Sequence, residues 1–184
     1  MKRAAILFAV AGALLCGKGV YIYAKAQYAQ FLLERAWQRT LDGERNAKPW
    51  SWADTSPVAK LEFPKQHRTY IVLAGASGRT MAFGPGHIDG TARPEENGNC
   101  AISAHRDTQF AVLRDLNVGD EIVLQTRDGR SIRYRVREHR VTDNRDTGLL
   151  EPSRGRILTL ITCFPFDAIR PGGPLRYVVI AAAA

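Results

Sequence analysis

The sequence predicts an all-β protein built on a closed or nearly closed barrel of about eight strands, with short helices and an N-terminal helical segment. From residue 57 onward the chain is a series of short apolar and β-branched runs, most of them ended by glycine or proline. The dipeptide Asp128-Gly129 separates two such runs, 121–126 and 131–141, and predicts a hairpin. Helical spacing is confined to residues 1–50 and to a short turn at 110–116.

Composition allows one domain with a real core plus an appendage, because the chain has 184 residues, 45% of them hydrophobic. The formal charge of +8 would permit nucleic-acid binding, but the basic residues are scattered and form no stripe interleaved with aromatic residues. We therefore expect no nucleic-acid partner, and a basic surface suits an anionic membrane or cell-wall setting. The three cysteines, Cys16, Cys100 and Cys163, are too few for a disulfide scaffold.

The N-terminus predicts a membrane anchor over residues 1–24. The basic pair Lys2-Arg3 precedes an apolar run that continues to residue 24 with one polar interruption, which is long enough to cross a bilayer as a helix. A cleaved signal peptide has the same basic start, but no small-x-small cleavage site stands out. A lipoprotein signal ending at Cys16 is the other alternative, and Leu15 is larger than the residue expected there. We expect an uncleaved single-pass anchor.

Residues 25–50 predict an amphipathic helix followed by a linker. The helix ends near Asp42-Gly43, and its apolar residues recur every three to four positions, as on one packed face: Tyr28, Phe31, Leu32, Ala36 and Trp37. The segment 48–55 is rich in aromatic residues, and we expect both of its tryptophans, Trp50 and Trp52, to pack on the domain that follows.

Residues 51–184 form the predicted barrel domain. The glycine- and proline-rich segments 84–98 and 147–152 are predicted loops. The predicted strands are 58–63, 69–73, 99–104, 121–126, 131–141, 156–162 and 175–182.

Cys163 follows the most apolar of these strands, 156–162, directly. Phe164-Pro165 comes next, and proline cannot donate to a sheet ladder, so the strand should stop there. The thiol is thus predicted at the mouth of a sheet, where a substrate can reach it. The competing interpretation is a buried structural cysteine.

His105 and Arg176 would complete a site for acyl transfer. His105 ends one predicted strand and Arg176 begins another. A thiol needs a nearby base or positive charge to act as a nucleophile near neutral pH, and an imidazole supplies both. The same imidazole can protonate a departing amine, and a guanidinium can stabilise a tetrahedral oxyanion.

These motifs resemble the sortase family. The run Thr159-Leu160-Ile161-Thr162-Cys163 matches the T-L-x-T-C signature, with His105 in S-A-H-R-D-T upstream and Arg176 in P-L-R-Y-V-V downstream. The aromatic segment 50–55 and the predicted anchor look like the class GN sortases of Gram-negative bacteria. That resemblance implies an inner-membrane, single-pass protein with an eight-stranded catalytic domain facing the periplasm.

The resemblance also implies the roles of individual residues. Cys163 would be the nucleophile, His105 the general acid and base, and Arg176 the stabiliser of substrate and oxyanion. Thr162 and Ala104, which precede the cysteine and the histidine, are expected to help bind the substrate. The substrate would be a protein with an LPxTG-like C-terminal sorting signal, which passes through a thioacyl-enzyme to an amine acceptor. No cofactor is implied, and since no acidic calcium-binding cluster is recognisable, no metal is expected.

Two other functions compete with this one. An L,D-transpeptidase also places histidine before cysteine, but its signature has glycine before the cysteine and arginine two positions after it, where this chain has Thr162 and Pro165. A non-enzymatic envelope-binding module would make the order of histidine, cysteine and arginine accidental.

The remaining histidines and the second cysteine of the barrel domain carry no predicted chemistry. His67, His87 and His139 are expected to be ordinary surface residues, because no motif surrounds them. Cys100 lies five positions before His105, about 16 Å along an extended strand. We therefore expect it to be buried, reduced and out of reach of Cys163.

Overall fold

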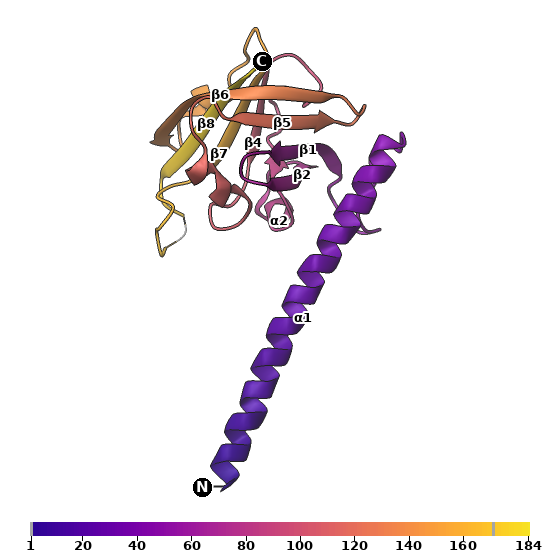
Figure 1. Ribbon diagram of the computed structural model, residues 1–184, viewed down its shortest axis with the longest axis vertical. Coiled ribbons are helices and arrows are strands. Elements are labelled where there is room, and N and C mark those ends of the chain that lie inside the picture. The colour runs from indigo at the N-terminus through magenta and orange to yellow at the C-terminus, as the bar shows by residue number, and fades with distance from the viewer. Residues whose placement is uncertain (1, 171) are drawn as a thin grey trace.

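Eight strands form the domain in the computed structural model, which describes residues 2–170 and 172–184, with side chains from residue 12 onward. They are β1 (Pro57–Phe63), β2 (Arg68–Ala74), β3 (Gly86–His87), β4 (Asn99–Ser103), β5 (Glu121–Thr126), β6 (Ser131–Asp143), β7 (Ile157–Cys163) and β8 (Leu175–Ala183). They close into a barrel in the order β1-β2-β3-β4-β7-β8-β6-β5 (Figure 1). The predicted barrel is confirmed.

Two of the strand pairs are parallel, β2 with β3 and β4 with β7, and the others are antiparallel. The predicted hairpin joins β5 to β6, and Gly129 takes the positive φ of 80° that its turn needs. The long strand β6 pairs with both β5 and β8, with a register shift between Val136 and Glu138.

Strand β3 lies inside the segment 84–98, which the sequence predicts as a loop, so that part of the prediction is wrong. It pairs with β2 on one side and β4 on the other. A Cβ atom on Gly86 would collide with the carbonyl oxygen of Gly75 and would lie 2.8 Å from the Cα of Ala76. The strand therefore depends on a close approach of two backbones that only glycine permits.

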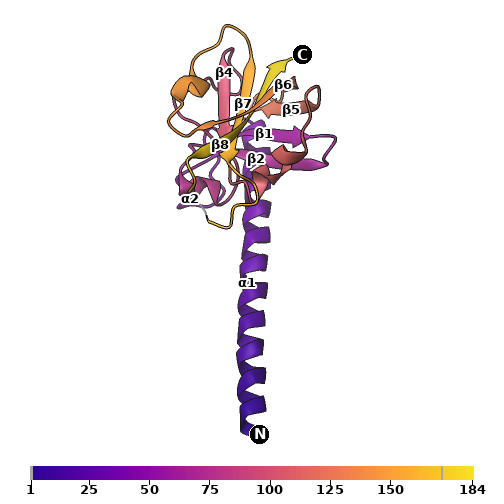
Figure 2. The same ribbon diagram turned by 90° about the vertical axis from the view of Figure 1, so that its left-hand side faces the viewer.

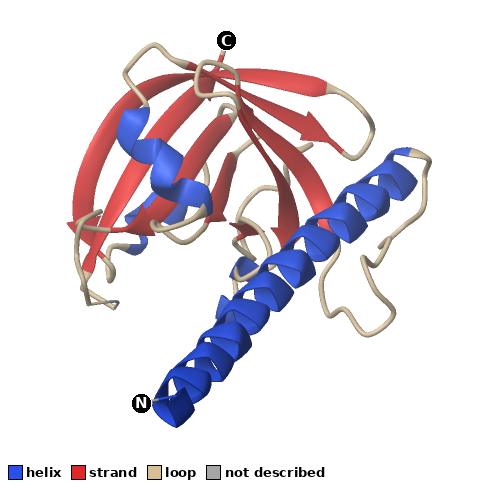
Figure 3. Cartoon of the chain, turned by 60° about the horizontal axis from the view of Figure 1, so that its bottom comes forward, coloured by secondary structure: helices blue, strands red, loops and turns tan. Residues whose placement is uncertain are grey.

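The barrel interior is the main hydrophobic core. Alternate residues of its strands point inward, including Leu61, Ile102, Leu124, Leu160 and Val179. The 3₁₀ helix η1 (Gln109–Asp115) adds Phe110, Val112 and Leu113 to the same core. This helix lies where a helical turn is predicted. Two other short helices, α2 (Gly78–Met81) and η2 (Thr147–Leu150), fall outside the predicted elements, and η2 stands in the predicted loop 147–152. Figure 3 shows short helices beside the strands of the barrel.

One helix, α1 (Lys2–Leu41), covers both N-terminal segments. It runs without interruption across residues 24 and 25, where the sequence suggested a boundary, and its N-terminal half projects away from the barrel (Figures 1 and 2). Among the described residues no helix is both long and apolar enough to span a bilayer. Part of the predicted anchor, up to residue 11, lies outside the described side chains.

The C-terminal half of α1 packs on the barrel with a face that matches the predicted one in part, since Ala36 and Trp37 are fully buried as expected. Leu33 and Trp37 are fully buried against Ile71 and Leu73 of β2. Tyr28 and Phe31, placed on the packed face by sequence spacing, are 62% and 55% exposed.

The Gln30 side-chain amide also fastens α1, donating to the Phe83 carbonyl at 2.8 Å. In the linker, Trp50 packs edge-on against Phe83, with ring centroids 4.9 Å apart. Trp52 is 84% exposed, so its predicted packing is wrong.

Candidate active site

The order of strands brings the three predicted catalytic residues to one edge of the sheet. Strand β7 lies between β4 and β8. In the antiparallel pair β7–β8, Cys163 is the direct partner of Arg176. In the parallel pair β4–β7, Ser103 is the partner of Ile161, so His105 and Cys163 each lie two residues beyond a paired position and in the same direction.

Two of these residues, Cys163 and Arg176, lie on the outer face of the barrel. Leu160 and Val179 point into the core, whereas Ile161 and Val178 pack together outside it against Leu149 of η2. Because side chains alternate along a strand, Cys163 and Arg176 lie on this outer face, two residues beyond Ile161 and before Val178. Both are half-buried, and His105, two residues past the end of β4, is exposed, so a ligand can reach each of the three side chains.

A buried hydrogen bond holds the ends of β4 and β7 together beside the site. The Thr162 hydroxyl donates to the Ala104 carbonyl at 2.7 Å, and the Ala104 amide donates to the Ile161 carbonyl at 3.3 Å. Both side chains are almost completely buried. Thr162 and Ala104 therefore contact each other, and this contact fixes the residues that follow them, Cys163 and His105. A role of Thr162 and Ala104 in binding the substrate stays a prediction.

Arg176 is held at the start of β8 by its own loop. One guanidinium nitrogen, Nη1, donates to the carbonyls of Gly173 at 2.8 Å and Leu175 at 2.9 Å. Within the described part of the chain, Nε and Nη2 of Arg176 have no hydrogen-bond partner. The guanidinium is thus oriented through one nitrogen and keeps further donors for a ligand.

Arg106 is a residue of this region that the sequence did not single out. It is 4% exposed, and its guanidinium donates to the Asp107 carboxylate at 3.2 Å. Its other donors reach the loop between β7 and β8. The only sequence signal was its place directly after His105, and no spacing rule predicts burial of an arginine there.

An aromatic cluster lines the chain just after the cysteine. Tyr177 contacts both Phe164 and Phe166, with ring centroids 6.1 and 5.0 Å apart. Its hydroxyl lies 2.9 Å from Nδ1 of His139, and burial raises the pKa of Tyr177. His139 is half-buried, so its prediction as a surface residue is wrong.

His87 is also misassigned as a surface residue. It is 8% exposed, and its Nε2 lies 2.9 Å from the Ala92 carbonyl. His67 is exposed, as expected.

Cys100 behaves as a structural thiol. It is 2% exposed and unpaired, and it lies opposite Leu158, at the far end of β7 from Cys163. Burial, together with Glu95 and Glu96, raises the pKa of Cys100 to about 12. The prediction that Cys100 is buried and does not pair with Cys163 is confirmed.

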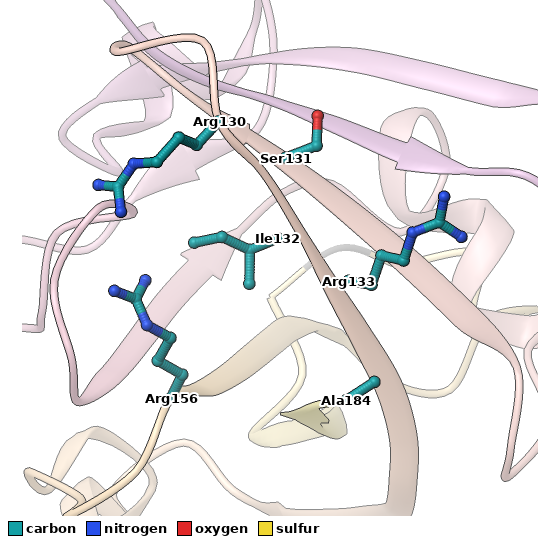
Figure 4. Close-up of a pocket in the computed structure, with 6 residues that line it drawn as sticks. All are labelled: Arg130, Ser131, Ile132, Arg133, Arg156 and Ala184. Atoms are coloured by element: carbon teal, nitrogen blue, oxygen red, sulfur yellow. The ribbon is translucent and has the colours of Figure 1, made fainter.

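One cleft lies away from this edge, near the opposite end of β7. This cleft measures about 610 Å³ and lies between the turn before β6, the residue before β7 and the C-terminal Ala184. Three arginines line it: Arg130, Arg133 and Arg156 (Figure 4). A second cleft of about 530 Å³ lies between β2 and η1. Neither is lined by the predicted catalytic residues. No group of three or more histidine, cysteine, aspartate or glutamate side chains that could hold a metal occurs among the described residues.

A closed β-barrel with cysteine, histidine and arginine at neighbouring strand ends defines a cysteine-dependent acyl-transfer type of site. Comparison with known proteins gives the family. The model of the sortase domain matches residues 61–184, and the chain belongs to the sortase family.

Individual relatives agree with this assignment. Sortase D of Bacillus subtilis is 30% identical over 120 residues, which are 65% of this chain and 60% of that protein. The match thus spans less than two thirds of that relative's length.

Solved structures agree as well. A sortase D5 transpeptidase of Clostridium perfringens is 25% identical with a TM-score of 0.68, over 86% of this chain and 99% of its own. The catalytic domain of B. anthracis SrtD is 33% identical with a TM-score of 0.60, over 70% of this chain and 87% of its own. These relatives come from Gram-positive organisms, so they give no support to the predicted class GN.

Proposed function

We propose that this protein is a cysteine transpeptidase that cleaves a C-terminal sorting signal and transfers the acyl fragment to an amine. The observation that carries the proposal is the direct pairing of Cys163 with Arg176, with His105 two residues past the end of β4, the strand that runs parallel to that of the cysteine. A nucleophile, a proton carrier and a fixed cation thereby stand at the ends of three neighbouring strands.

In the first half of the reaction the Cys163 thiolate attacks the carbonyl carbon of the scissile peptide. A C–S bond forms, and the carbonyl oxygen becomes an oxyanion that the guanidinium of Arg176 stabilises. The tetrahedral intermediate then collapses with cleavage of the C–N bond. His105 donates its proton to the departing amine, which leaves a thioacyl group on Cys163 and a neutral imidazole.

In the second half an acceptor amine attacks the thioacyl carbon. A new C–N bond forms as the C–S bond breaks, and His105 accepts the proton that the amine loses. Cys163 is released as the thiolate and His105 as the imidazolium, so the starting state is restored and the acyl fragment is held by a new amide bond.

The proposed substrate is an LPxTG-like signal cleaved between its threonine and glycine. Support comes from membership of the sortase family, whose domain model matches residues 61–184. In this proposal the half-buried Cys163 and Arg176 receive the threonine carbonyl of the signal.

We further propose that α1 holds the enzyme at the inner membrane with the barrel facing the periplasm. The described N-terminal half of α1 carries exposed apolar side chains: Leu14, Leu15, Val20, Tyr21, Ile22 and Tyr23. Together with the basic residues at its start, this pattern supports membrane association. The class GN assignment rests on this segment and on the aromatic residues 50–55, and it stays a prediction.

The test is a transfer assay with the full chain. The protein is incubated with an LPxTG-containing peptide and a small primary amine, and products are identified by mass spectrometry. We expect cleavage after threonine and an amide of the N-terminal fragment with the amine, and neither product with Cys163→Ala. Transfer by Cys163→Ala at the wild-type rate would refute the proposal. If neither protein cleaves, the same assay with a library of pentapeptides separates a wrong sorting signal from a wrong reaction.

A further inference from the structure

Arg106 follows His105 directly in the sequence, and its side chain is a buried cation. With 4% of its surface exposed, its guanidinium has almost no water to solvate it, and an arginine does not lose its charge when buried. The one carboxylate that pairs with it, on Asp107, is itself 68% exposed at the side chain. Most of the compensation for the buried charge must therefore come from other acceptors.

Those acceptors are main-chain carbonyls of a single loop, the one that joins β7 to β8. Nη1 of Arg106 donates to Pro165 at 2.7 Å, and Nη2 donates to Ala168 at 2.6 Å and to Arg170 at 3.3 Å. This loop begins immediately after Cys163 and ends at the strand that carries Arg176. The planar fork of the guanidinium can reach carbonyls in several directions at once.

A second arginine from the connection between β4 and β5, which also contains Arg106, contacts the β7–β8 loop. Arg114 of η1 lies over the ring of Phe166, with its guanidinium carbon 5.0 Å from the ring centroid, and donates to the Phe166 carbonyl at 3.4 Å. The histidine is held on the same segment, because the Phe110 amide donates to the His105 carbonyl at 3.0 Å. The connection from β4 to β5 thus carries both His105 and the groups that fasten the β7–β8 loop.

We infer that Arg106 is a positioning residue of the acyl-transfer site: it fastens the β7–β8 loop to the segment that carries His105. Through the loop it sets where Cys163 and Arg176 stand relative to the imidazole. Its kinetic consequence rests on the proposed function, whereas its effect on the loop and on thiol reactivity does not. A purely structural arginine would change the stability of the barrel and leave the reactivity of the folded protein unchanged.

The test compares Arg106→Ala and Arg106→Lys in the full chain with Arg135→Ala. Arg135 is the matched control, because its guanidinium also donates to a main-chain carbonyl, that of Gly119 at 3.0 Å, on an exposed part of β6. Alkylation of Cys163 by iodoacetamide is followed by mass spectrometry of its peptide, so that the exposed Cys16 does not interfere. Hydrogen exchange of the 164–170 peptide reports on the loop, and thermal unfolding reports on the fold.

We expect Arg106→Ala to speed exchange in the loop and to lower the alkylation rate of folded protein by about 10- to 100-fold, since small displacements in such sites have effects of that size. Lysine keeps the charge but presents its donors from a single nitrogen, so Arg106→Lys should recover only part of the rate. With an active wild type, kcat should fall more than KM rises. Arg135→Ala should match the wild type in all readouts.

A folded Arg106→Lys protein with wild-type loop exchange and wild-type alkylation would overturn the inference, whether or not Arg106→Ala folds. The inference would also be overturned if the alkylation rate of Cys163 in Arg106→Ala changed only in proportion to the fraction of unfolded protein. If the wild type cleaves no peptide, the proposed function is at fault, and the exchange and alkylation results still decide the role of Arg106.

Discussion

Replacing Thr162 by valine removes one hydroxyl and keeps the shape of the side chain. In the folded protein that hydroxyl donates to the Ala104 carbonyl at 2.7 Å, and both residues are buried. The variant therefore leaves a buried carbonyl oxygen without this donor, which costs about 1–3 kcal/mol. For a chain of this length the melting temperature should fall by roughly 2–4 °C for each kcal/mol.

The position of the bond adds a functional effect to the loss of stability. It ties the residue before Cys163 to the residue before His105, so its loss should loosen the thiol relative to the imidazole. We expect the alkylation rate of Cys163 in the folded variant to fall by about 10-fold. The assay pairs urea unfolding, for stability, with iodoacetamide labelling under conditions where the protein stays folded.

Thr159→Val is the matched control. Thr159 lies on the same strand, is also buried, and donates to the Asn99 side-chain oxygen at 2.7 Å. It should cost a similar free energy of unfolding, about 1–3 kcal/mol, and leave Cys163 as reactive as in the wild type. Equal reactivity of the two variants would refute the reasoning, as would a Thr162→Val protein as stable as the wild type.

Three further predictions follow from the same structure. Cys163→Ala should abolish turnover, and His105→Ala and Arg176→Ala should each lower kcat by about 100-fold or more with the fold intact. Steady-state kinetics measures kcat and circular dichroism checks the fold; a folded variant with wild-type kcat would contradict the assigned role. Because the pKa of Cys100 is raised to about 12 from 9.0, its neutral form stabilises the fold below pH 9, and this contribution is lost as the pH rises further. Cys100→Ser should therefore flatten the alkaline fall in unfolding free energy and keep activity. An unchanged dependence of unfolding free energy on pH would contradict this. Trp37→Ala should cost about 3–5 kcal/mol by opening the contact between α1 and β2; a loss below about 1 kcal/mol in urea unfolding would show that α1 is not docked as described.

The predicted catalytic residues could be proposed from the sequence because each stands near a strand end that its own sequence marks. Pro165 marks the end of the strand before Cys163, and the run before His105 is plainly β. What the sequence did not show is which strands are neighbours. The parallel pairing of β4 with β7 and the register that sets Cys163 against Arg176 emerge only when the barrel closes.

The missed features depend on long-range contacts. Strand β3 needs Gly86 to approach the carbonyl of Gly75, a contact that local pattern does not encode. The docked face of α1 was predicted only in part, because apolar residues lie on more than one side of that helix and contact with β2 selects Leu33 over Tyr28 and Phe31. Arg106 looked like an ordinary charged loop residue, since its carbonyl partners are about sixty positions away in the chain.

The central claim is that Cys163 carries the acyl group between the two halves of the reaction. The most direct measurement is the mass of the full chain, quenched with acid after incubation with a sorting-signal peptide and no amine acceptor. We predict an added mass equal to the peptide fragment that ends in threonine, located on Cys163 by fragmentation and lost when an amine is supplied. Cleavage of the peptide with no adduct on Cys163, or with the adduct on another residue, would contradict the account.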